Sequence, residues 1–406
     1  MIKTPFTFEE LTLPQGFSWG GAEAAVKHEG RLDVGLLYAD APCVAAATFT
    51  QNAFAAAPVL YSKDALMNAN NTAQCIVVNS GCANAATGEQ GFINAQKCAQ
   101  IAGKSSNVNE EHVLVCSTGT IGVQLPMDRM EKGINAAALD LASDASHFER
   151  FVRSIMTTDT VPKAAGKTFN CGGEKVSIVG CCKGSGMIHP MMATMLGFVA
   201  TDAIISSDFL QVVFRRCIER SFNCVTVDGD TSTNDTAIIL ASGKAGKAIA
   251  PNTVEALEFE TALCEVMQSM ARQMARDGEG ASKLVEIVIK EAKSFEDSRL
   301  IGYQIANSPL VKTALFGNDA NWGRIACAIG NAPVKVNTNT IGIFLGDIEM
   351  MCDGEPLPFD EDKALKILQQ EEVKITVTLG LGKQEATVWT CDLTNKYIEI
   401  NGCYRT

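Results

Sequence analysis

The feature that most constrains the fold is a regular alternation between short apolar runs and longer amphipathic helical patterns. Residues 253–274 form the strongest helical pattern, because Phe259, Leu263 and Val266 repeat at the spacing of one helix face. Residues 373–379 instead alternate between apolar and polar side chains, which is the period of a strand with one buried face. Such a mixture predicts an α+β fold in which layered sheets are covered by helices.

The same patterns divide the chain into expected elements. Strands are expected at residues 75–79, 112–116, 176–180, 195–201, 236–241, 283–290, 373–379, 384–390 and 397–401, and helices at residues 89–102, 127–141, 147–155, 207–222 and 253–274. Residues 163–173 and 243–251 contain several glycines and lysines and are interpreted as surface loops. The last strands are expected to form an antiparallel sheet with one polar face.

Composition excludes several classes of function. The 406 residues carry 34 Lys and Arg against 46 Asp and Glu, and an acidic chain without a basic patch repels nucleic acids and anionic membranes. The first twenty residues contain no apolar signal-peptide core, and no run of about 18 apolar residues predicts a membrane span. The fifteen cysteines show no C-x-x-C spacing. They are interpreted as packing residues of a protein in a reducing cytoplasm.

The familiar catalytic templates are absent. The chain contains no glycine-rich phosphate loop, no G-x-G-x-x-G after a strand, no G-x-S-x-G elbow and no H-E-x-x-H. Its four histidines stand apart, so none is spaced to share a metal ion with another. A serine or cysteine triad would need a histidine base, and the sequence nominates none.

Several polar segments rich in glycine, threonine and asparagine remain between the apolar strands. They are residues 79–88 (NSGCANAATG), 117–122 (STGTIG), 183–196 (KGSGMIHPMMATML), 227–235 (VDGDTSTND) and 276–280 (RDGEG). Each of them alone is typical of a turn. Their number is unusual, and loops on a rigid scaffold often carry function.

Thr194 offers nucleophilic chemistry that needs no histidine. If the bond between Ala193 and Thr194 is cut, the freed α-amine, with a pKa of about 7.7–8.0, is the general base for the hydroxyl of the same residue. The small side chain of Ala193 leaves its carbonyl open to attack by that hydroxyl, and hydrolysis of the resulting ester completes the cut. From the residues alone, a packed strand position is the commoner role of an internal threonine.

Residues 183–203 (KGSGMIHPMMATMLGFVATDA) closely resemble the self-cleaving segment of the glutamate N-acetyltransferase, or ornithine acetyltransferase, family of arginine biosynthesis. The similarity covers essentially the whole chain and includes STGTIG, MTTDTVPKA, TVDGDTSTND, RDGEGASK, NSPLVKTALFGNDANWGRI and the terminal NGCYRT. Several long motifs in the same order make it specific. It implies ping-pong transfer of an acetyl group from N-acetylornithine to glutamate through an acetyl-threonine.

The resemblance also implies how the protein is organised. Cleavage before Thr194 would give a light (alpha) chain, residues 1–193, and a heavy (beta) chain, residues 194–406, which assemble as a heterotetramer of two copies of each. The implied fold is an α+β layered one with an N-terminal threonine nucleophile, distinct in topology from the N-terminal-nucleophile hydrolases. Small molecules are the implied partners, without metal or organic cofactor. Some family members also accept acetyl-CoA.

Carried over by position, Thr194 is the nucleophile and Thr118 and Gly119 form the oxyanion hole. Substrate contacts fall on Thr158, Lys183, Thr194, Glu279, Asn401 and Thr406. Lys183 and Glu279 supply opposite charges, which suits a substrate that carries a carboxylate and an ammonium group. A surface salt bridge is the alternative for that pair, and a plain turn after a strand is the alternative for Thr118 and Gly119.

Two residues depart from the family pattern, which commonly has Asn at the position of Cys82 and a hydrophobic residue at that of Thr120. Two other functions stay open. One is a hydrolase that uses the same threonine to release acetate or to cleave an amide. The other is a metabolite-binding protein that never cleaves itself.

Overall fold

The computed structural model describes residues 6–189 and 195–403. Among these residues, eight strands form the first sheet, in the order β4-β3-β2-β8-β7-β6-β5 with β1 paired to β2. They are β1 (Phe17–Ala22), β2 (Val34–Phe49), β3 (Thr72–Asn79), β4 (Val113–Ser117), β5 (Lys163–Cys171), β6 (Glu174–Lys183), β7 (Leu196–Ile205) and β8 (Thr236–Ile249). Strand β7 is buried at nearly every residue, as expected for a strand that is covered on both faces.

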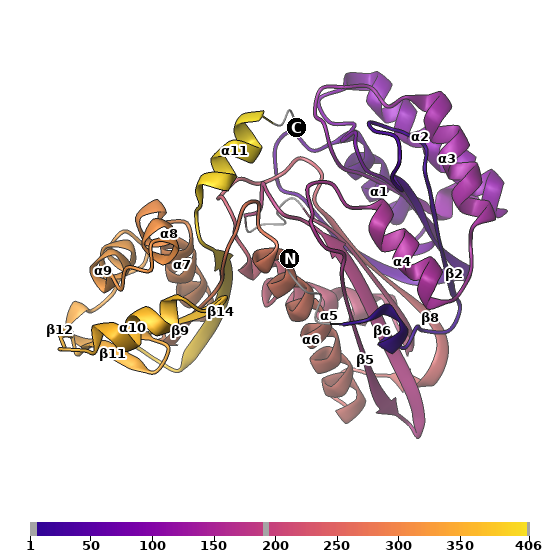
Figure 1. The fold of residues 1–406 in the computed structure, drawn as a ribbon. Coiled ribbons are helices and arrows are strands. Elements are labelled where there is room, and N and C mark those ends of the chain that lie inside the picture. The colour runs from indigo at the N-terminus through magenta and orange to yellow at the C-terminus, as the bar shows by residue number, and fades with distance from the viewer. Residues whose placement is uncertain (1–5, 190–194, 404–406) are drawn as a thin grey trace.

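Helices cover both faces of this sheet (Figure 1). On one face lie α1 (Ala57–Asn68), α2 (Gly88–Ser106), α3 (Met127–Leu139) and α4 (Ala145–Ser154), and on the other lie α5 (Ser207–Glu219) and α6 (Val254–Arg276). Along β8, Ile238 and Leu240 pack into the first core and Ile239 into the second. The predicted stripe of α6 is confirmed, because Phe259, Leu263 and Val266 are all buried in the second core.

Six strands among the described residues form the second sheet, in the order β12-β11-β10-β13-β9-β14. They are β9 (Leu284–Ala292), β10 (Gly342–Leu345), β11 (Ile348–Cys352), β12 (Glu355–Pro356), β13 (Glu372–Thr378) and β14 (Gln384–Cys391). A third core joins this sheet to α7 (Phe295–Ala306), α8 (Pro309–Phe316), α9 (Trp322–Gly330) and α10 (Glu361–Leu368). Helix α6 contacts β5 and β6 of the first sheet and β9 and β14 of the second, so it lies between the two sheets (Figure 1).

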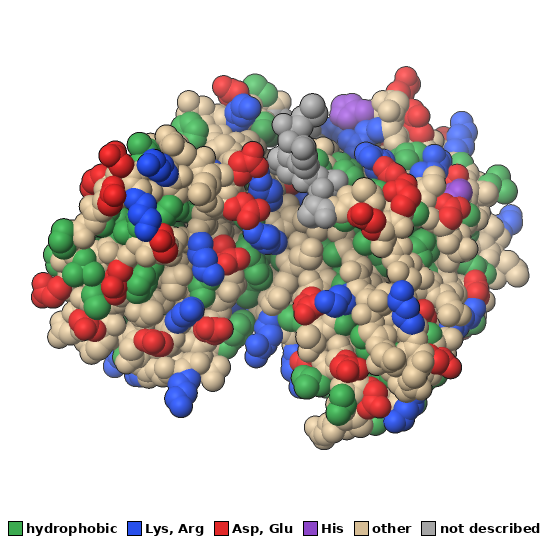
Figure 2. All heavy atoms as spheres, turned by 60° about the horizontal axis from the view of Figure 1, so that its bottom comes forward, with side chains coloured by type: hydrophobic (Ala, Val, Ile, Leu, Met, Phe, Trp, Pro, Cys, Tyr) green, Lys and Arg blue, Asp and Glu red, His purple; other side chains and the backbone are tan. Residues whose placement is uncertain are grey.

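The remaining described helices are α11 (Asn395–Cys403) and the short 3-10 helices Phe8–Glu10, Glu110–His112, Phe222–Cys224 and Thr338–Thr340. No helix of the described residues is long and apolar enough to cross a membrane. Figure 2 shows Lys and Arg interspersed with Asp and Glu over one face of the molecule, without a broad basic patch on that face.

The interpretation of residues 163–173 and 243–251 as surface loops is wrong. Most of residues 163–173 form β5, which pairs with β6 along its whole length, and most of residues 243–251 extend β8. The first error has a physical reason: β5 is the edge strand of its sheet, and edge strands commonly carry lysine. Lys167 accordingly lies in the exposed part of the strand, whereas Lys163 at its start is buried.

The C-terminal region holds two further corrections. Residues 397–401 lie in helix α11 rather than in a strand. After β14 the chain turns at Thr394, whose hydroxyl donates to the Gly280 carbonyl (2.7 Å) and accepts the Lys396 N–H (3.2 Å). The second sheet is mixed rather than antiparallel, because β13 pairs in parallel with β9. The expected polar face of β13 is confirmed by the alternating burial of its residues.

Candidate active site

A cavity of about 120 Å³ lies at the edge of the first sheet where β4 and β6 end. Six residues nominated from the sequence line it, namely Thr118, Gly119, Thr158, Lys183, Glu279 and Asn401. They come from segments that are far apart in the chain and that the two sheets bring together. The other nominated positions, Ala193, Thr194 and Thr406, lie outside the described residues.

The turn after β4 presents Thr118 and Gly119 to the cavity. The Thr118 N–H donates to the Asn79 carbonyl (3.0 Å), so it is already used within the protein. The Lys183 ammonium donates to Thr118 Oγ1 (3.1 Å), and because an ammonium group cannot accept, the hydroxyl keeps its own proton for another partner. Gly119 has a φ of +130°, and a Cβ there would lie 2.3 Å from the carbonyl carbon of Gly81. Only glycine fits this turn.

The two departures from the family pattern pack against the same turn. Cys82 forms isolated β-bridges with Thr118 and Thr120, and its thiol donates to the Val123 carbonyl (3.3 Å). Thr120 is buried, and its hydroxyl has no hydrogen-bond partner in the part of the chain that the structure describes. A hydrophobic side chain at this position would therefore lose no hydrogen bond.

Lys183, the last residue of β6, is buried in the wall of the cavity. Burial lowers the pKa of its ammonium group, the carboxylate of Asp159 opposes this effect, and the nearby charge of Lys163 reinforces it. Asp235 and Glu279 also favour the charged form, yet the pKa stays below its ordinary value. A buried cation in this condition gains from a further anionic partner.

Glu279 occupies a tight turn that follows α6. Its N–H donates to the Ser185 carbonyl (2.9 Å), and its Oε2 accepts from the side-chain amide of Asn401 in α11 (2.8 Å). The carboxylate packs directly over Gly186, where an added Cβ would lie 2.3 Å from it. Glu279 and Lys183 are both buried and form no ion pair with each other, so a surface salt bridge does not describe this pair.

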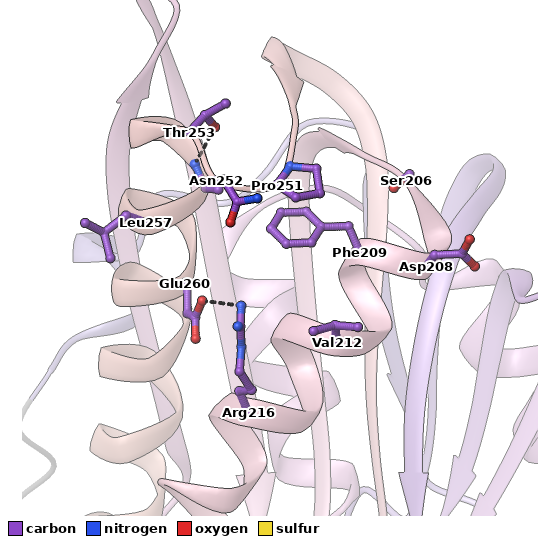
Figure 3. Close-up of a pocket in the computed structure, with 11 residues that line it drawn as sticks. Ser206, Asp208, Phe209, Val212, Arg216, Pro251, Asn252, Thr253, Leu257 and Glu260 are labelled. Atoms are coloured by element: carbon purple, nitrogen blue, oxygen red, sulfur yellow. Dashed lines mark hydrogen bonds and ion pairs between the residues drawn. The ribbon is translucent and has the colours of Figure 1, made fainter.

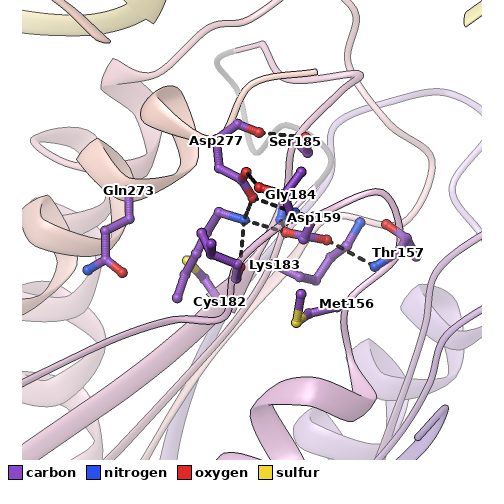
Figure 4. A network of polar contacts seen from close by, with 12 residues as sticks. Met156, Thr157, Asp159, Cys182, Lys183, Gly184, Ser185, Gln273 and Asp277 are labelled. Carbon is purple, nitrogen blue, oxygen red and sulfur yellow. Dashed lines mark hydrogen bonds and ion pairs between the residues drawn. The ribbon is translucent and has the colours of Figure 1, made fainter. Parts of the chain in front are cut away.

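Beside the cavity lies a buried ion network that the sequence patterns did not single out (Figure 4). Lys163 Nζ is 2.6 Å from Asp159 Oδ1 and 2.5 Å from Asp277 Oδ2, and the three side chains are at most 1% exposed. Burial would raise the pKa of Asp159, but the charges of Lys163 and Lys183 outweigh it and hold that pKa well below its usual range. Burial likewise would lower the pKa of Lys163, but Asp159 and Asp277 raise it to about 12.

Two acidic residues of segment 227–235 were also missed. Asp228 accepts the N–H of Met187 (2.6 Å) and the hydroxyl of Tyr397 (3.2 Å), and burial raises its pKa despite these bonds. Asp235 is fully buried and accepts the Met195 N–H (3.0 Å), and burial raises its pKa well above its usual value. The signal available was the position of both residues within a nominated segment. Which of its acidic residues face inward depends on tertiary contacts.

A larger hollow of about 560 Å³ lies between α5 and α6 (Figure 3). None of the nominated residues lines it, and the charged groups of Arg216 and Glu260 in its wall already pair with each other (2.6 Å).

No group of three or more His, Cys, Asp or Glu within residues 6–189 and 195–403 is arranged to hold a metal ion. All fifteen cysteines are free thiols and most are buried, as expected of packing residues. The cavity at the sheet edge is therefore the candidate active site.

Known proteins match this chain over nearly its whole length. The model of the ArgJ family matches residues 18–406. The chain belongs to the ArgJ family. The arginine biosynthesis bifunctional protein ArgJ of Thermotoga neapolitana is 44% identical, and the match spans 98% of this chain and all of that protein. The mitochondrial ArgJ of Neurospora crassa is also 44% identical, with 97% of this chain and 89% of that protein covered.

A solved ArgJ structure gives a similar result for part of the chain. The crystal structure of the arginine biosynthesis bifunctional protein from Bacillus halodurans matches with a TM-score of 0.50 and 42% identity. The match covers 98% of that crystallised chain but only 51% of this one, so the crystallised ArgJ chain is about half as long as the chain described above.

Proposed function

We propose that this ArgJ-family chain is an acyltransferase of arginine biosynthesis that moves an acetyl group from N-acetylornithine to glutamate, giving ornithine and N-acetylglutamate. The observation that carries the proposal is that six nominated residues from distant segments line one cavity in a chain of this family. The names of its relatives, which place them in arginine biosynthesis and call them bifunctional, support the same activity.

The oxyanion of acetyl transfer would be stabilised by the Thr118 hydroxyl and the Gly119 N–H. The Thr118 N–H cannot serve, because it donates to the Asn79 carbonyl. The hydrogen bond from Lys183 to Thr118 Oγ1 polarises the hydroxyl and makes it a stronger donor. Loss of one donor of such a pair typically reduces kcat by a factor of about 10²–10³.

Recognition of the substrates would use the opposite charges of the cavity. Both N-acetylornithine and glutamate carry an α-carboxylate, which would pair directly with the buried Lys183 ammonium and add to the carboxylates around it. The α-nitrogen of N-acetylornithine is acylated, so its one ammonium group is on the side chain and would meet Glu279. Thr158 and Asn401 line the same space and would add hydrogen bonds. Thr406, which the sequence resemblance adds to this set, lies outside the described residues.

The nucleophile would be Thr194, released by cleavage of the bond to Ala193. Its hydroxyl would attack the Ala193 carbonyl, and hydrolysis of the ester would leave fragments 1–193 and 194–406 with a free α-amine on Thr194. The half-length chain of the Bacillus halodurans relative supports a cut near the middle of the sequence. The antiparallel pairing of β6 with β7 is compatible with such a cut, because β6 of the first fragment and β7 of the second would stay paired after it.

The transfer itself would proceed in two half-reactions. The amine of Thr194 takes the proton of its own hydroxyl while Oγ attacks the acetyl carbonyl of N-acetylornithine. The same proton then passes to the departing nitrogen of ornithine, which leaves an acetyl ester on Thr194. The neutral α-amine of glutamate attacks that ester, Oγ leaves, and the proton given up by the attacking nitrogen returns to Oγ. No metal ion or organic cofactor takes part in this scheme.

Three further points belong to the proposal. Acetyl-CoA would serve as an alternative acetyl donor, which would account for the word bifunctional in the names of the relatives. Two copies of each fragment would assemble as a heterotetramer. The free thiols fit a reducing compartment, which we propose to be the cytoplasm.

An intact-mass spectrum of the purified protein beside its Thr194→Ala variant tests the proposal first. We expect two fragments that match residues 1–193 and 194–406 in the unmodified protein and one full-length chain in the variant. Acetyl transfer to glutamate should accompany the fragments and be lost in the variant. Full-length chain in both samples would overturn the mechanism. Steady acetate release without glutamate would instead identify a hydrolase.

A further inference from the structure

We propose that Asp159, Lys163 and Asp277 are positioning residues that hold Thr158, Lys183 and Glu279 in place around the cavity, with Asp159 as the counter-ion of Lys183. The inference rests on the proposed function, in which Lys183 binds the carboxylate of the substrate. None of the three positioning residues lines the cavity itself.

Asp159 connects two cavity-lining segments. Its Oδ2 accepts the Thr157 N–H (2.9 Å), which fixes the loop that carries Thr158. Its Oδ1 accepts the Gly184 N–H (2.7 Å), which fixes the end of β6 directly after Lys183. One carboxylate therefore holds the segments of Thr158 and Lys183, two of the residues that would contact the substrate, next to each other.

Asp277 connects the loop that carries Thr158 to the turn that carries Glu279. Its side chain accepts the Lys163 ammonium (2.5 Å) and the Thr160 N–H (3.0 Å), and it also accepts the Thr160 hydroxyl. Its backbone carbonyl accepts the Ser185 hydroxyl (2.6 Å), and the Ser185 carbonyl accepts the Glu279 N–H (2.9 Å). The turn that carries Glu279 is thereby tied to the loop that carries Thr158.

The charges of Asp159, Lys163 and Asp277 balance when Lys183 is counted with them. Lys163 and Lys183 supply two positive charges, and Asp159 and Asp277 supply two negative ones, all in side chains that are almost fully buried. The charged groups that face Lys183 are Asp159, Lys163, Asp235 and Glu279, and the thiol of Cys182 lies next to it in the chain. Asp159 contributes the largest of the attractive charges, whereas Asp277 is not among the main contributors.

This asymmetry provides a matched pair of variants. The first double variant combines Lys163→Met with Asp277→Asn and is called the Asp277→Asn pair variant; it removes the ion pair but keeps Asp159 opposite Lys183. The second combines Lys163→Met with Asp159→Asn and is called the Asp159→Asn pair variant; it removes the same number of charges but leaves Lys183 without its counter-ion. Both double variants keep the net charge of the region at zero, so they differ in which carboxylate remains rather than in how many. Lys167, on the same strand as Lys163, forms an exposed ion pair with Glu265 of α6. Lys167→Met breaks this pair and is the control for a general effect of altering β5.

The measurement is the pH dependence of kcat/KM for N-acetylornithine, with kcat and KM separated at each pH. Loss of an opposite charge near a buried ammonium shifts its pKa by about one unit or more. Lys163→Met removes a nearby positive charge in both pair variants and should raise the pKa of Lys183 equally in each. We therefore expect the alkaline limb of the Asp159→Asn pair variant to lie about one pH unit below that of the Asp277→Asn pair variant, with the loss mainly in KM. The limb of the Lys167→Met control should stay in place.

Several outcomes would overturn the inference. Equal shifts in both pair variants, or no shift in either, would mean that the network serves folding alone. Asp159→Glu keeps the charge and extends the side chain by one methylene, so it should retain the alkaline limb and raise only KM. This single variant keeps the test available if a pair variant fails to fold, and an alkaline limb that moves down by about one pH unit in it would count against the inference. Failure of the proposed function would appear separately, as absence of acetyl transfer in the unmodified enzyme.

Discussion

The buried lysines next to the two sheets are satisfied in different ways. In the first sheet, Lys163 of β5 and Lys183 of β6 lie among carboxylates. Beside the second sheet, the buried ammonium group of Lys312 donates instead to the Thr390 hydroxyl (3.0 Å) and the Cys391 carbonyl. Lys283 likewise donates to the Leu315 carbonyl (2.5 Å) and the Asn318 amide oxygen (2.6 Å).

The difference teaches how each region uses a buried charge. Carbonyl and hydroxyl acceptors fix the geometry of an ammonium group and, in the second region, join α8 and the end of β14 to their neighbours. Carboxylate acceptors fix the geometry and also set the electrostatic field around it. Only the first arrangement lies next to the cavity, where such a field would act on the proposed substrate.

The largest expected effect is that of removing a buried charge from each region in turn. Lys163→Met takes the shared ammonium partner away from two buried carboxylates, and we expect it to lower the free energy of unfolding by about 3–5 kcal/mol. Lys312→Met leaves only neutral acceptors unpaired, with an expected loss of about 1–3 kcal/mol. Urea unfolding of both variants in the Thr194→Ala background, where the proposed cut cannot occur, would measure the contrast. Equal losses would remove the distinction between the two regions.

The stability of the two regions should also depend on pH in different ways. Because the pKa of Asp159 is lower in the folded protein than its unfolded value of about 3.9, its stabilising effect is present above about pH 4 and is lost as the pH falls further. In the Thr194→Ala background, the difference in unfolding free energy between the parent and Asp159→Asn should thus be constant above pH 5 and shrink below pH 4. The corresponding difference for Lys312→Met should not change in this range, since its acceptors do not titrate. Parallel pH series of urea unfolding would decide.

The smallest effects concern one buried hydroxyl in each region. Thr390→Val removes the acceptor of the Lys312 ammonium, and we expect a loss of about 1–2 kcal/mol. Thr120→Val has almost the same shape change but removes a hydroxyl without a partner among the described residues, so its effect should lie near zero or be slightly stabilising. Thermal unfolding of the two variants side by side is sufficient. A loss for Thr120→Val as large as that for Thr390→Val would show that the Thr120 hydroxyl is bonded in solution.

The sequence predicted the strongly periodic helices and strands and six residues that line the cavity, but not the buried ion network of Asp159, Lys163 and Asp277 beside it. The reason lies in the strand β5. Residues 163–173 were interpreted as a loop, and a lysine in a surface loop is expected to be exposed. The strand β5 instead places Lys163 under α6, where it meets Asp277 from a segment that is distant in the chain. Local periodicity carries no information about such a contact.

Asn401 shows the opposite case. Its secondary structure was predicted wrongly, since α11 replaces the expected strand, yet the motif placed it in the cavity beside Glu279. The motif resemblance indicates which residues come together at a site, but not the secondary structure of the segments that carry them. Periodicity indicates the secondary structure, but not which residues come together. The two kinds of prediction therefore failed at different positions.

The strand order of the first sheet has a consequence for how the protein would refold after the proposed cleavage. Strands β7 and β8 belong to the proposed second fragment and lie between β2 and β6 of the first. Neither fragment could complete the sheet by itself, so the chain would have to fold before the proposed cut. After that cut, an unfolded protein would have to bring two separate chains together again, and its refolding would become a bimolecular reaction that slows on dilution. Such an enzyme would persist because it unfolds slowly rather than because it refolds readily.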